Sequence, residues 1–178
     1  VGTQDPNPLV SGRGVELLRR AGLEVEVGIL EPECTRLIAP FAKHVTTGMP
    51  FVILKTAITL DGKTATLTGD SQWISNEMSR ACVHRMRDRV DGLMVGIGTL
   101  LRDNPRLNTR LPDGGRNPQR IIVDRRLDTP SDAAFFNIEA PVIIAAGENA
   151  SEEKANTLSA LGAQVWRFSE EGGRIDLQ

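Results

Sequence analysis

The amino-acid sequence predicts an α/β fold built around a mainly parallel sheet. Apolar runs of strand length alternate with helical patterns along residues 51–178. Strands of this kind are typical of parallel sheets, which are buried between helices. The 178 residues suffice for one substantial core, or for one domain and a piece of another.

The first part of the chain is expected to hold helices and one strand. Residues 14–20 have helical spacing, which stops at a plausible C-terminal cap, Ala21-Gly22. Residues 24–29 alternate polar and apolar side chains like a half-buried strand. Residues 31–45 favour a helix that Pro40 must kink or break, because proline cannot donate the helical hydrogen bond.

A short connector over residues 46–50 marks the main boundary, so we expect two parts, residues 1–48 and 49–178. After the connector, residues 51–58 have the apolar character of a largely buried strand. Ser75 is a suitable N-cap for a helix over residues 76–89.

The predicted helix over residues 76–89 has two distinct faces. Its spacing brings four apolar side chains together on a face expected to meet the core: Met78, Ala81, Cys82 and Met86. Three basic side chains share another face, at Arg80, His84 and Arg87.

The rest of the chain completes the α/β pattern. Strands are expected at residues 92–97, 121–123, 141–146 and 164–168, with a helix at 151–161. The first of these strands ends in Gly96-Ile97-Gly98-Thr99, and Thr99 is expected to cap the following helix. A long loop spans residues 103–119, and loops of this length in compact domains are usually functional or disordered.

The charge of the chain is unevenly distributed. The net charge is −2, yet residues 80–126 contain eleven arginines, no lysine and five acidic residues. Arginine binds phosphate and carboxylate groups through planar, bidentate contacts, so this region suggests an anion site. A solvated, arginine-rich surface is the alternative, and composition leaves the two equally open.

The ends of the predicted strands indicate where an anion would bind. In an open parallel sheet the ligand crevice lies beyond the carboxyl ends of the strands. Gly96 to Thr99 and Asp124-Arg125 occupy such ends, although a simple tight turn also explains the glycines. Four arginines are candidates to converge there: Arg87, Arg102, Arg106 and Arg110.

Other classes of function receive little support. Aromatic residues make up 4% of the chain and the pI is near 5.8, so a nucleic-acid partner is not expected. No apolar run reaches the length of a membrane span, and no leader pattern precedes the domain, so we expect a cytoplasmic location and no membrane partner. Cys34 and Cys82 are expected to be buried free thiols.

Three motifs, in order, resemble a known enzyme family. The segments "PFVILKTAITLDGKTATLTGDSQWIS", "VHRMRDRVDGLMVGIGTLLRDNPRLNTR" and "PQRIIVD" resemble the reductase domain of the bacterial bifunctional riboflavin-biosynthesis deaminase–reductase. The first part of the chain, with "DPNPLVSGRGVELLRRAGLEVEVGILEPEC", is similar to the closing part of its deaminase domain. We therefore expect residues 1–48 to be a deaminase remnant of a cytidine-deaminase-like α/β domain.

The resemblance implies a dihydrofolate-reductase-like fold and an NADPH-dependent reductase. Its substrate would be 5-amino-6-(5-phosphoribosylamino)uracil, a phosphoribosylaminopyrimidine that becomes the ribitylamino product. The hydride would reach C1 of the ring-opened ribose. Both NADPH and this substrate are polyanions, which would explain the arginines.

The resemblance also implies roles for individual residues, by motif position. Catalytic positions match Lys55 and Asp103. Cofactor-binding positions match Ala57, Trp73, Thr99, Asp103 and Arg125, with Trp73 as a wall for a flat cofactor group. Substrate-binding positions match Ser71, Arg87, Leu107 and Arg110, with Arg87 assigned to the phosphate.

The chain departs from the family pattern at three places. Asn104 stands where the family usually has a second acid. Arg125 replaces a residue that is often small, and we hypothesise that it binds the 2′-phosphate of NADPH. Glu171-Gly172-Gly173 imitates a later family motif but is interpreted as a decoy, and the following "RIDLQ" as the start of a helix.

Further expectations concern the extent of the chain and its alternatives. The reductase part is expected to be truncated at its C-terminus. The zinc-binding motif of the deaminase is expected only in a portion of the parent protein outside this chain, so we expect no metal here. A related pyrimidine or pterin reductase and a non-catalytic nucleotide-binding module are the alternatives, and homo-oligomerisation stays open.

Overall fold

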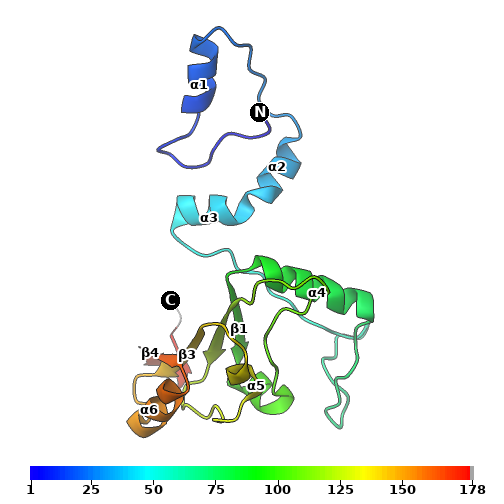
Figure 1. Cartoon of the computed structure of the whole chain (residues 1–178), viewed down its shortest axis with the longest axis vertical. Helices are drawn as coiled ribbons and strands as arrows, with labels where there is room; N and C mark the ends of the chain where they lie inside the picture. Colours follow the sequence, from blue (N-terminus) through cyan, green and yellow to red (C-terminus); the bar gives the residue numbers. More distant parts are fainter. Residues whose placement is uncertain (177–178) are drawn as a thin grey trace. The chain divides into compact units, whose positions relative to one another are not determined.

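The computed structural model describes residues 1–176, which divide into two compact units. The first unit comprises Val1–Ala57 and the second begins at Ile58. Figure 1 shows three helices in the first unit and a sheet with helices in the second. The division falls after the connector at residues 46–50.

The first unit contains α1 (Arg13–Arg20), α2 (Glu31–Leu37) and α3 (Ala39–Thr47). The predicted helix at 14–20 is confirmed as α1. Pro40 occupies one of the first two positions of α3, where its missing N–H costs no helical hydrogen bond. The predicted break therefore falls at Ile38, which ends α2 and begins α3.

The predicted strand at residues 24–29 is wrong. The backbone of this segment pairs with the backbone of a single residue: the Val1 ammonium donates to the Glu26 carbonyl at 2.8 Å, and the Gly28 N–H donates to the Val1 carbonyl at 2.9 Å. One pairing residue cannot extend a ladder, so the alternating pattern yields an irregular segment.

The predicted strand at residues 51–58 is also wrong. The segment is irregular, and its apolar side chains are exposed, with 79% of Val52 and 87% of Leu54 accessible to solvent. A strand needs a hydrogen-bonded neighbour, and none of the described strands pairs with this one. Apolar character alone was therefore insufficient to define a strand.

The second unit contains a four-stranded sheet in the order β1-β2-β3-β4, with every neighbouring pair parallel. The predicted α/β fold with a mainly parallel sheet is thus confirmed. Its strands lie close to the predicted positions: β1 is Gly92–Gly96, β2 is Gln119–Val123, β3 is Val142–Gly147 and β4 is Ala163–Phe168.

The helices of the second unit are α4 (Glu77–Arg89), α5 (Ile97–Asp103) and α6 (Glu152–Ala160), with a short 3₁₀ helix, η1, at Ala134–Asn137. Ser151 caps α6, because its side chain accepts the Lys154 N–H. The predicted helix at 151–161 is therefore confirmed.

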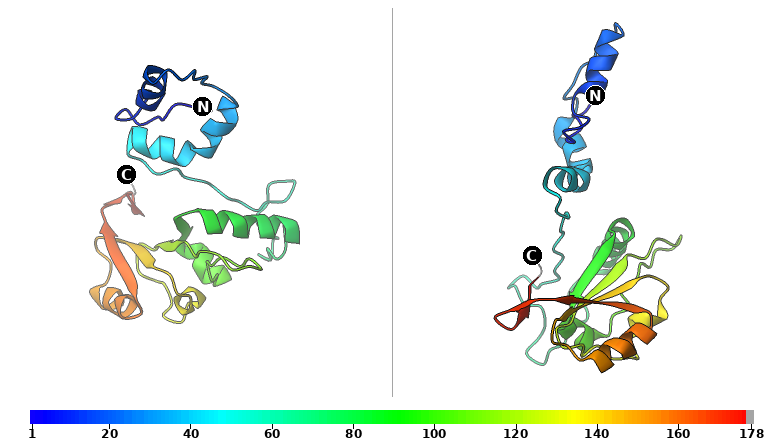
Figure 2. Two further views of the ribbon diagram at one scale, coloured as in Figure 1. Left: turned by 45° about the horizontal axis from the view of Figure 1, so that its top comes forward. Right: turned by 90° about the vertical axis from the view of Figure 1, so that its left-hand side faces the viewer.

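A hairpin of β5 (Glu170–Glu171) and β6 (Arg174–Ile175) follows β4 (Figure 2). Gly172 and Gly173 form its two-residue turn, and both have positive φ, as a type I′ turn requires. The expectation that "RIDLQ" begins a helix is therefore wrong for Arg174 and Ile175. Its last two residues lie outside the described part.

The core of the second unit surrounds β3, which is buried along its whole length. Ile122 of β2, Ile144 of β3 and Phe135 of η1 are fully buried and belong to one cluster. Continuous burial of β3 explains why its sequence is an unbroken apolar run.

Arg120 is a charged member of this core. Its side chain is 1% exposed, and its guanidinium donates to the main-chain carbonyls of Phe135, Ile138 and Ala140. Arg120 therefore attaches η1 and the segment after it to β2. The role of Arg120 is therefore structural, and its guanidinium is not part of an anion site.

We expect Arg120→Met to lower the free energy of unfolding by about 2–4 kcal/mol, because three carbonyls lose their donor in a buried setting. Urea denaturation measures the change. Arg126→Met, at an exposed arginine, is the control and is expected to change stability by less than about 0.5 kcal/mol. Equal effects of the two substitutions would contradict this role.

Helix α4 differs from its prediction in both its cap and its buried face. Asn76, not Ser75, is the N-cap, since its side chain accepts the Ser79 N–H at 2.9 Å. Three residues of the expected core face, Met78, Ala81 and Cys82, are exposed, and Met86 is half-buried. The expectation that Cys82 is buried is therefore wrong. The half-buried residues include His84 and Arg87, because the loop after α5 packs against them.

Candidate functional site

The carboxyl ends of β1 and β2 lead directly into predicted site residues. Gly96 ends β1 and is the N-cap of α5, so the prediction that Thr99 caps this helix is wrong. Thr99 lies in the first turn of α5, Asp103 ends the helix, and both are exposed. Arg125 follows β2 by two residues, at the same edge of the sheet because the strands are parallel.

A cluster of polar groups forms where α4 meets the loop at residues 104–118. We call His84, Arg87, Asn108 and Arg110 the α4–loop cluster. Arg87 Nη1 donates to the Asn108 carbonyl at 3.0 Å, and the Arg110 N–H donates to His84 Nδ1 at 3.2 Å. Arg110 Nη1 donates to Asn108 Oδ1 at 3.0 Å. The cluster joins two residues that were predicted to bind substrate.

The cluster has a concentrated positive charge. In the described part of the chain, neither Arg87 nor Arg110 forms an ion pair with a carboxylate. Burial, and then the charge of Arg110, lower the pKa of Arg87. Arg87 Nε is buried and has no hydrogen-bond partner. A bound anion would supply the charge and the acceptor that this cluster lacks.

His84 is held between these cations. Burial is the largest cause that lowers its pKa below 6.5, followed by the charges of Arg110 and Arg87, and these outweigh a hydrogen bond to the Asn108 main chain that raises it. The lowered pKa favours the neutral imidazole, in agreement with Nδ1 accepting the Arg110 N–H.

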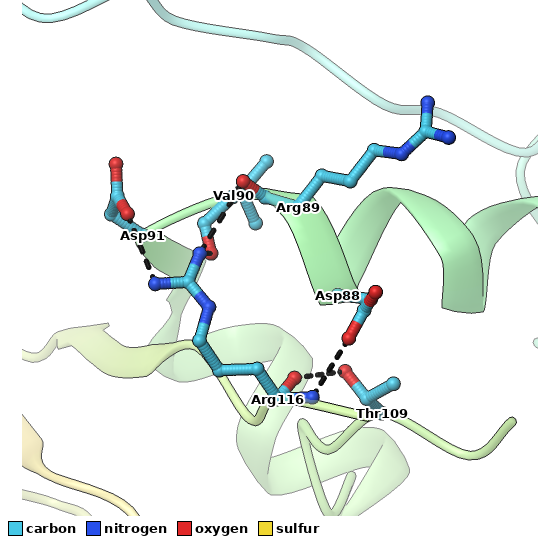
Figure 3. A network of polar contacts seen from close by, with 6 residues as sticks. All are labelled: Asp88, Arg89, Val90, Asp91, Thr109 and Arg116. Carbon is cyan, nitrogen blue, oxygen red and sulfur yellow. Dashed lines mark hydrogen bonds and ion pairs between the residues drawn. The ribbon is translucent and has the colours of Figure 1, made fainter. Parts of the chain in front are cut away.

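Hydrogen bonds of Arg116 hold the far end of the same loop (Figure 3). Its N–H donates to Asp88 Oδ1 at 2.7 Å, and its guanidinium donates to the Val90 carbonyl at 3.0 Å and to Asp91 Oδ1 at 3.2 Å. Thr109 Oγ1 donates to the Arg116 carbonyl at 2.8 Å. The loop is therefore fastened to the C-terminal end of α4.

Leu107 anchors the loop from its other side. Its side chain is buried in the core cluster, and its backbone has φ +52°, a left-handed value that leucine rarely adopts. Asn104 also has a positive φ, and its Oδ1 accepts the Ala134 N–H at 2.8 Å. Asn104 thus links α5 to η1, which is a structural use for this departure from the family pattern.

Trp73 lies in the loop before α4 and is 70% exposed. The Arg80 guanidinium lies 4.5 Å from the centre of its ring, a cation–π distance, and Arg80 Nη1 donates to the Ser75 carbonyl at 2.5 Å. Ser71 is half-buried, and Arg102 of α5 donates to the Gly69 carbonyl. The loop that bears Ser71 and Trp73 is therefore attached to both α4 and α5.

Arg125 borders a cavity of about 170 Å³. Its Nη1 lies 2.8 Å from Glu170 Oε2, and this pair is partly buried. Gly147 lies against the pair, where a side chain would collide with Glu170. The other residues that line the cavity are Arg126, Asn149, Ala150 and Ser151.

The predicted residues are thus not all in one cavity. A second cavity, of about 110 Å³, is lined by residues of α5 and the segment before η1. Neither cavity is lined by Trp73, Arg87 or Thr99. Lys55 and Ala57 belong to the first unit, and Lys55 is exposed. Their predicted roles remain predictions.

Three residues of these sites were missed by the sequence interpretation: Asn108, Arg116 and Glu170. Each acts on a partner at least 21 residues away, so no local spacing indicates it. Within residues 1–176, no three or more His, Cys, Asp or Glu side chains gather as a metal site would require. In the same residues, every helix is too short or too polar to cross a membrane.

The fold and site define an α/β domain with an all-parallel main sheet and with cationic groups at α4 and at the carboxyl end of β2. The chain belongs to the RibD C-terminal domain family, whose family model matches residues 50–178. The resemblance noted from the three motifs is therefore confirmed.

Related proteins extend the match beyond that domain. The chain is 45% identical over 167 residues to the riboflavin biosynthesis protein RibD of Aquifex aeolicus, covering 93% of this chain and 46% of the relative. It is 40% identical over 178 residues to RibD of Bacillus amyloliquefaciens, covering 99% and 47%. The chain spans about half the length of the curated relatives it matches.

Solved structures agree with this relationship. The diaminohydroxyphosphoribosylaminopyrimidine deaminase/5-amino-6-(5-phosphoribosylamino)uracil reductase of Thermotoga maritima is similar with a TM-score of 0.75 and 39% identity, over 95% of this chain and 52% of that one. Acinetobacter baumannii RibD, form 1, is similar with a TM-score of 0.74 and 36% identity, over 94% and 47%.

Proposed function

We propose that the chain carries the reductase part of a riboflavin-biosynthesis enzyme. Its reaction is the NADPH-dependent reduction of the ribosyl group of 5-amino-6-(5-phosphoribosylamino)uracil, in the cytoplasm. Membership of the RibD C-terminal domain family supports the proposal, and so does the reductase named in the Thermotoga relative's description. The structural observation that carries it is the pair of Arg87 and Arg110, for which residues 1–176 supply no carboxylate partner.

The α4–loop cluster is proposed to hold the phosphate of the substrate. Two guanidinium groups beside one another repel, and a phosphate dianion relieves that repulsion through charge-assisted hydrogen bonds. Arg87 Nε, which is buried without an acceptor, gains one. Ser71 is proposed to contact the rest of the substrate, and so is Leu107, through its main chain because its side chain is buried in the core.

The cavity at Arg125 suits one phosphate group of the cofactor. Its lining offers two guanidiniums, an amide and a hydroxyl, a set of donors that matches phosphate oxygens. A volume of about 170 Å³ accommodates a phosphate and not a whole dinucleotide. We assign Arg125 to the 2′-phosphate of NADPH, and Ala57, Trp73, Thr99 and Asp103 to the remainder.

NADPH, when bound, supplies the hydride. The residues of this chain bind and orient the two anionic molecules, and Lys55 is proposed to orient a hydroxyl of the sugar or to relay its proton. Asp103 is the second group assigned to catalysis.

The proposal is tested by following the loss of nicotinamide absorbance when the protein is mixed with NADPH and the phosphoribosylaminopyrimidine. Oxidation that requires the pyrimidine supports it. Tight NADPH binding without turnover, in this chain and in the full-length parent, would instead favour a nucleotide-binding module. Turnover with a pterin and not with the phosphoribosyl compound would favour a related reductase.

A further inference from the structure

His84 contacts the main chain of the residue that supplies the second guanidinium of the α4–loop cluster. Its Nδ1 accepts the Arg110 N–H at 3.2 Å, across 26 residues of sequence. One turn further along α4, Arg87 donates to the carbonyl of Asn108. Helix α4 therefore holds the loop by an acceptor and a donor, at main-chain groups two residues apart.

The contact requires a neutral imidazole. With Nδ1 accepting, the ring proton must lie on Nε2, whereas a protonated ring has N–H donors at both positions. A second proton would set two donors against each other and place a third cation beside Arg87 and Arg110. The remaining charged residues of this helix face point elsewhere, Arg80 to Trp73 and Asp88 to the Arg116 N–H.

We propose that neutral His84 is a positioning residue, which fixes the main chain at Arg110 so that its guanidinium stays beside Arg87, and that acid releases this contact. The consequence for catalysis rests on the proposed function, in which Arg87 and Arg110 bind the substrate phosphate. The contact between His84 and Arg110 is independent of that function.

The direction of the pH effect follows from the position of the ring. The pKa of His84 in the folded protein lies below 6.5, the ordinary value, because burial and then the charges of Arg110 and Arg87 outweigh the hydrogen bond to the Asn108 main chain, which raises it. The folded protein therefore binds fewer protons here than the unfolded chain does. The contribution of neutral His84 to stability is fully present above pH 6.5. It diminishes as the pH falls from 6.5 towards the lowered pKa, and the contact with Arg110 is lost as the pH passes that pKa.

Two substitutions separate the acceptor from the ring. His84→Asn keeps an acceptor near the position of Nδ1, and its amide is not protonated between pH 5 and 8. His84→Leu removes the acceptor. The first measurement is the hydrogen-exchange protection of the Arg110 amide by ¹H–¹⁵N NMR between pH 5 and 8. We expect the wild type to lose roughly fivefold in protection at the acid end, the size of one hydrogen bond. His84→Asn should stay protected throughout, and His84→Leu should be unprotected throughout.

Equal protection of Arg110 in the wild type and in His84→Leu at pH 8 would overturn the proposal, provided that the amides of the sheet show that both are folded. A wild-type protection that does not change with pH would also overturn it.

The second measurement is the dissociation constant for ribose 5-phosphate over the same range. The ratio of the wild-type constant to the His84→Asn constant removes the titration of the phosphate itself. We expect this ratio to rise roughly fivefold as the pH falls. A falling ratio would show that protonated His84 binds the phosphate, and would overturn the positioning role. If protection changes as expected and the ratio is constant, the contact stands and the proposed phosphate site is wrong.

Discussion

Replacing Arg87 with alanine is expected to raise the KM for the phosphoribosylaminopyrimidine by roughly 30- to 1,000-fold and to leave the KM for NADPH almost unchanged. The loss corresponds to about 2–4 kcal/mol, because a partly buried guanidinium that is proposed to bind the phosphate is removed together with its contact to Asn108. Steady-state kinetics with each substrate varied in turn measure both constants.

Two further variants show whether the effect belongs to the site. Arg85→Ala changes an exposed arginine of the same helix and is expected to have no effect on either KM. Arg87→Lys keeps the charge and loses the planar fork, so we expect an intermediate KM. If Arg87→Ala instead raised both KM values equally, with a lower melting temperature, Arg87 would be a structural residue and not a ligand of the phosphate.

Replacing Arg125 with alanine is expected to lower kcat/KM for NADPH by roughly 10- to 100-fold while kcat/KM for NADH stays within about twofold, because the 2′-phosphate alone distinguishes the two cofactors. The geometry adds a competitor, since Arg125 already pairs with Glu170 at 2.8 Å. A phosphate must displace this carboxylate or share the guanidinium with it.

Glu170→Gln is therefore the matched variant for this site. It keeps the shape of the side chain and removes the charge that competes with phosphate, so we expect kcat/KM for NADPH to rise and kcat/KM for NADH to change little. Unchanged cofactor preference in both Arg125→Ala and Glu170→Gln would place the 2′-phosphate elsewhere. The pair would then be an ordinary link between β2 and β5.

The elements of the second unit that were predicted well share a local cause. Strand β3 is an unbroken apolar run, and β2 contains a shorter one. Helix α6 has Ser151 as its N-cap, whose side chain reaches a main-chain N–H only three residues away. Pro40 breaks the helix in the first unit through its own missing N–H. Each signal acts within one turn or one strand, so the sequence alone is sufficient to predict it.

The incorrect predictions, of a strand at residues 51–58 and of the buried face of α4, share a different cause. Residues 51–58 have the composition of a buried strand, yet a strand exists only when another backbone pairs with it, and composition does not identify the partner. The face of α4 that contains Met78 was expected inside for its apolar side chains. The carbonyl and N–H groups of a loop more than 20 residues away instead occupy the opposite face.

The arginines show most clearly what a local sequence pattern cannot predict, namely the partner of each guanidinium. The count of eleven between residues 80 and 126 predicted a cationic region and an anionic ligand. The fold assigns them separate tasks: Arg120 supports η1, Arg116 fastens the loop, Arg80 covers Trp73, and Arg87 with Arg110 forms the unneutralised pair. Charge and periodicity are properties of the chain and can be predicted without coordinates. The partner of a guanidinium depends on which distant main-chain groups folding brings within 3 Å, and that information exists only in three dimensions.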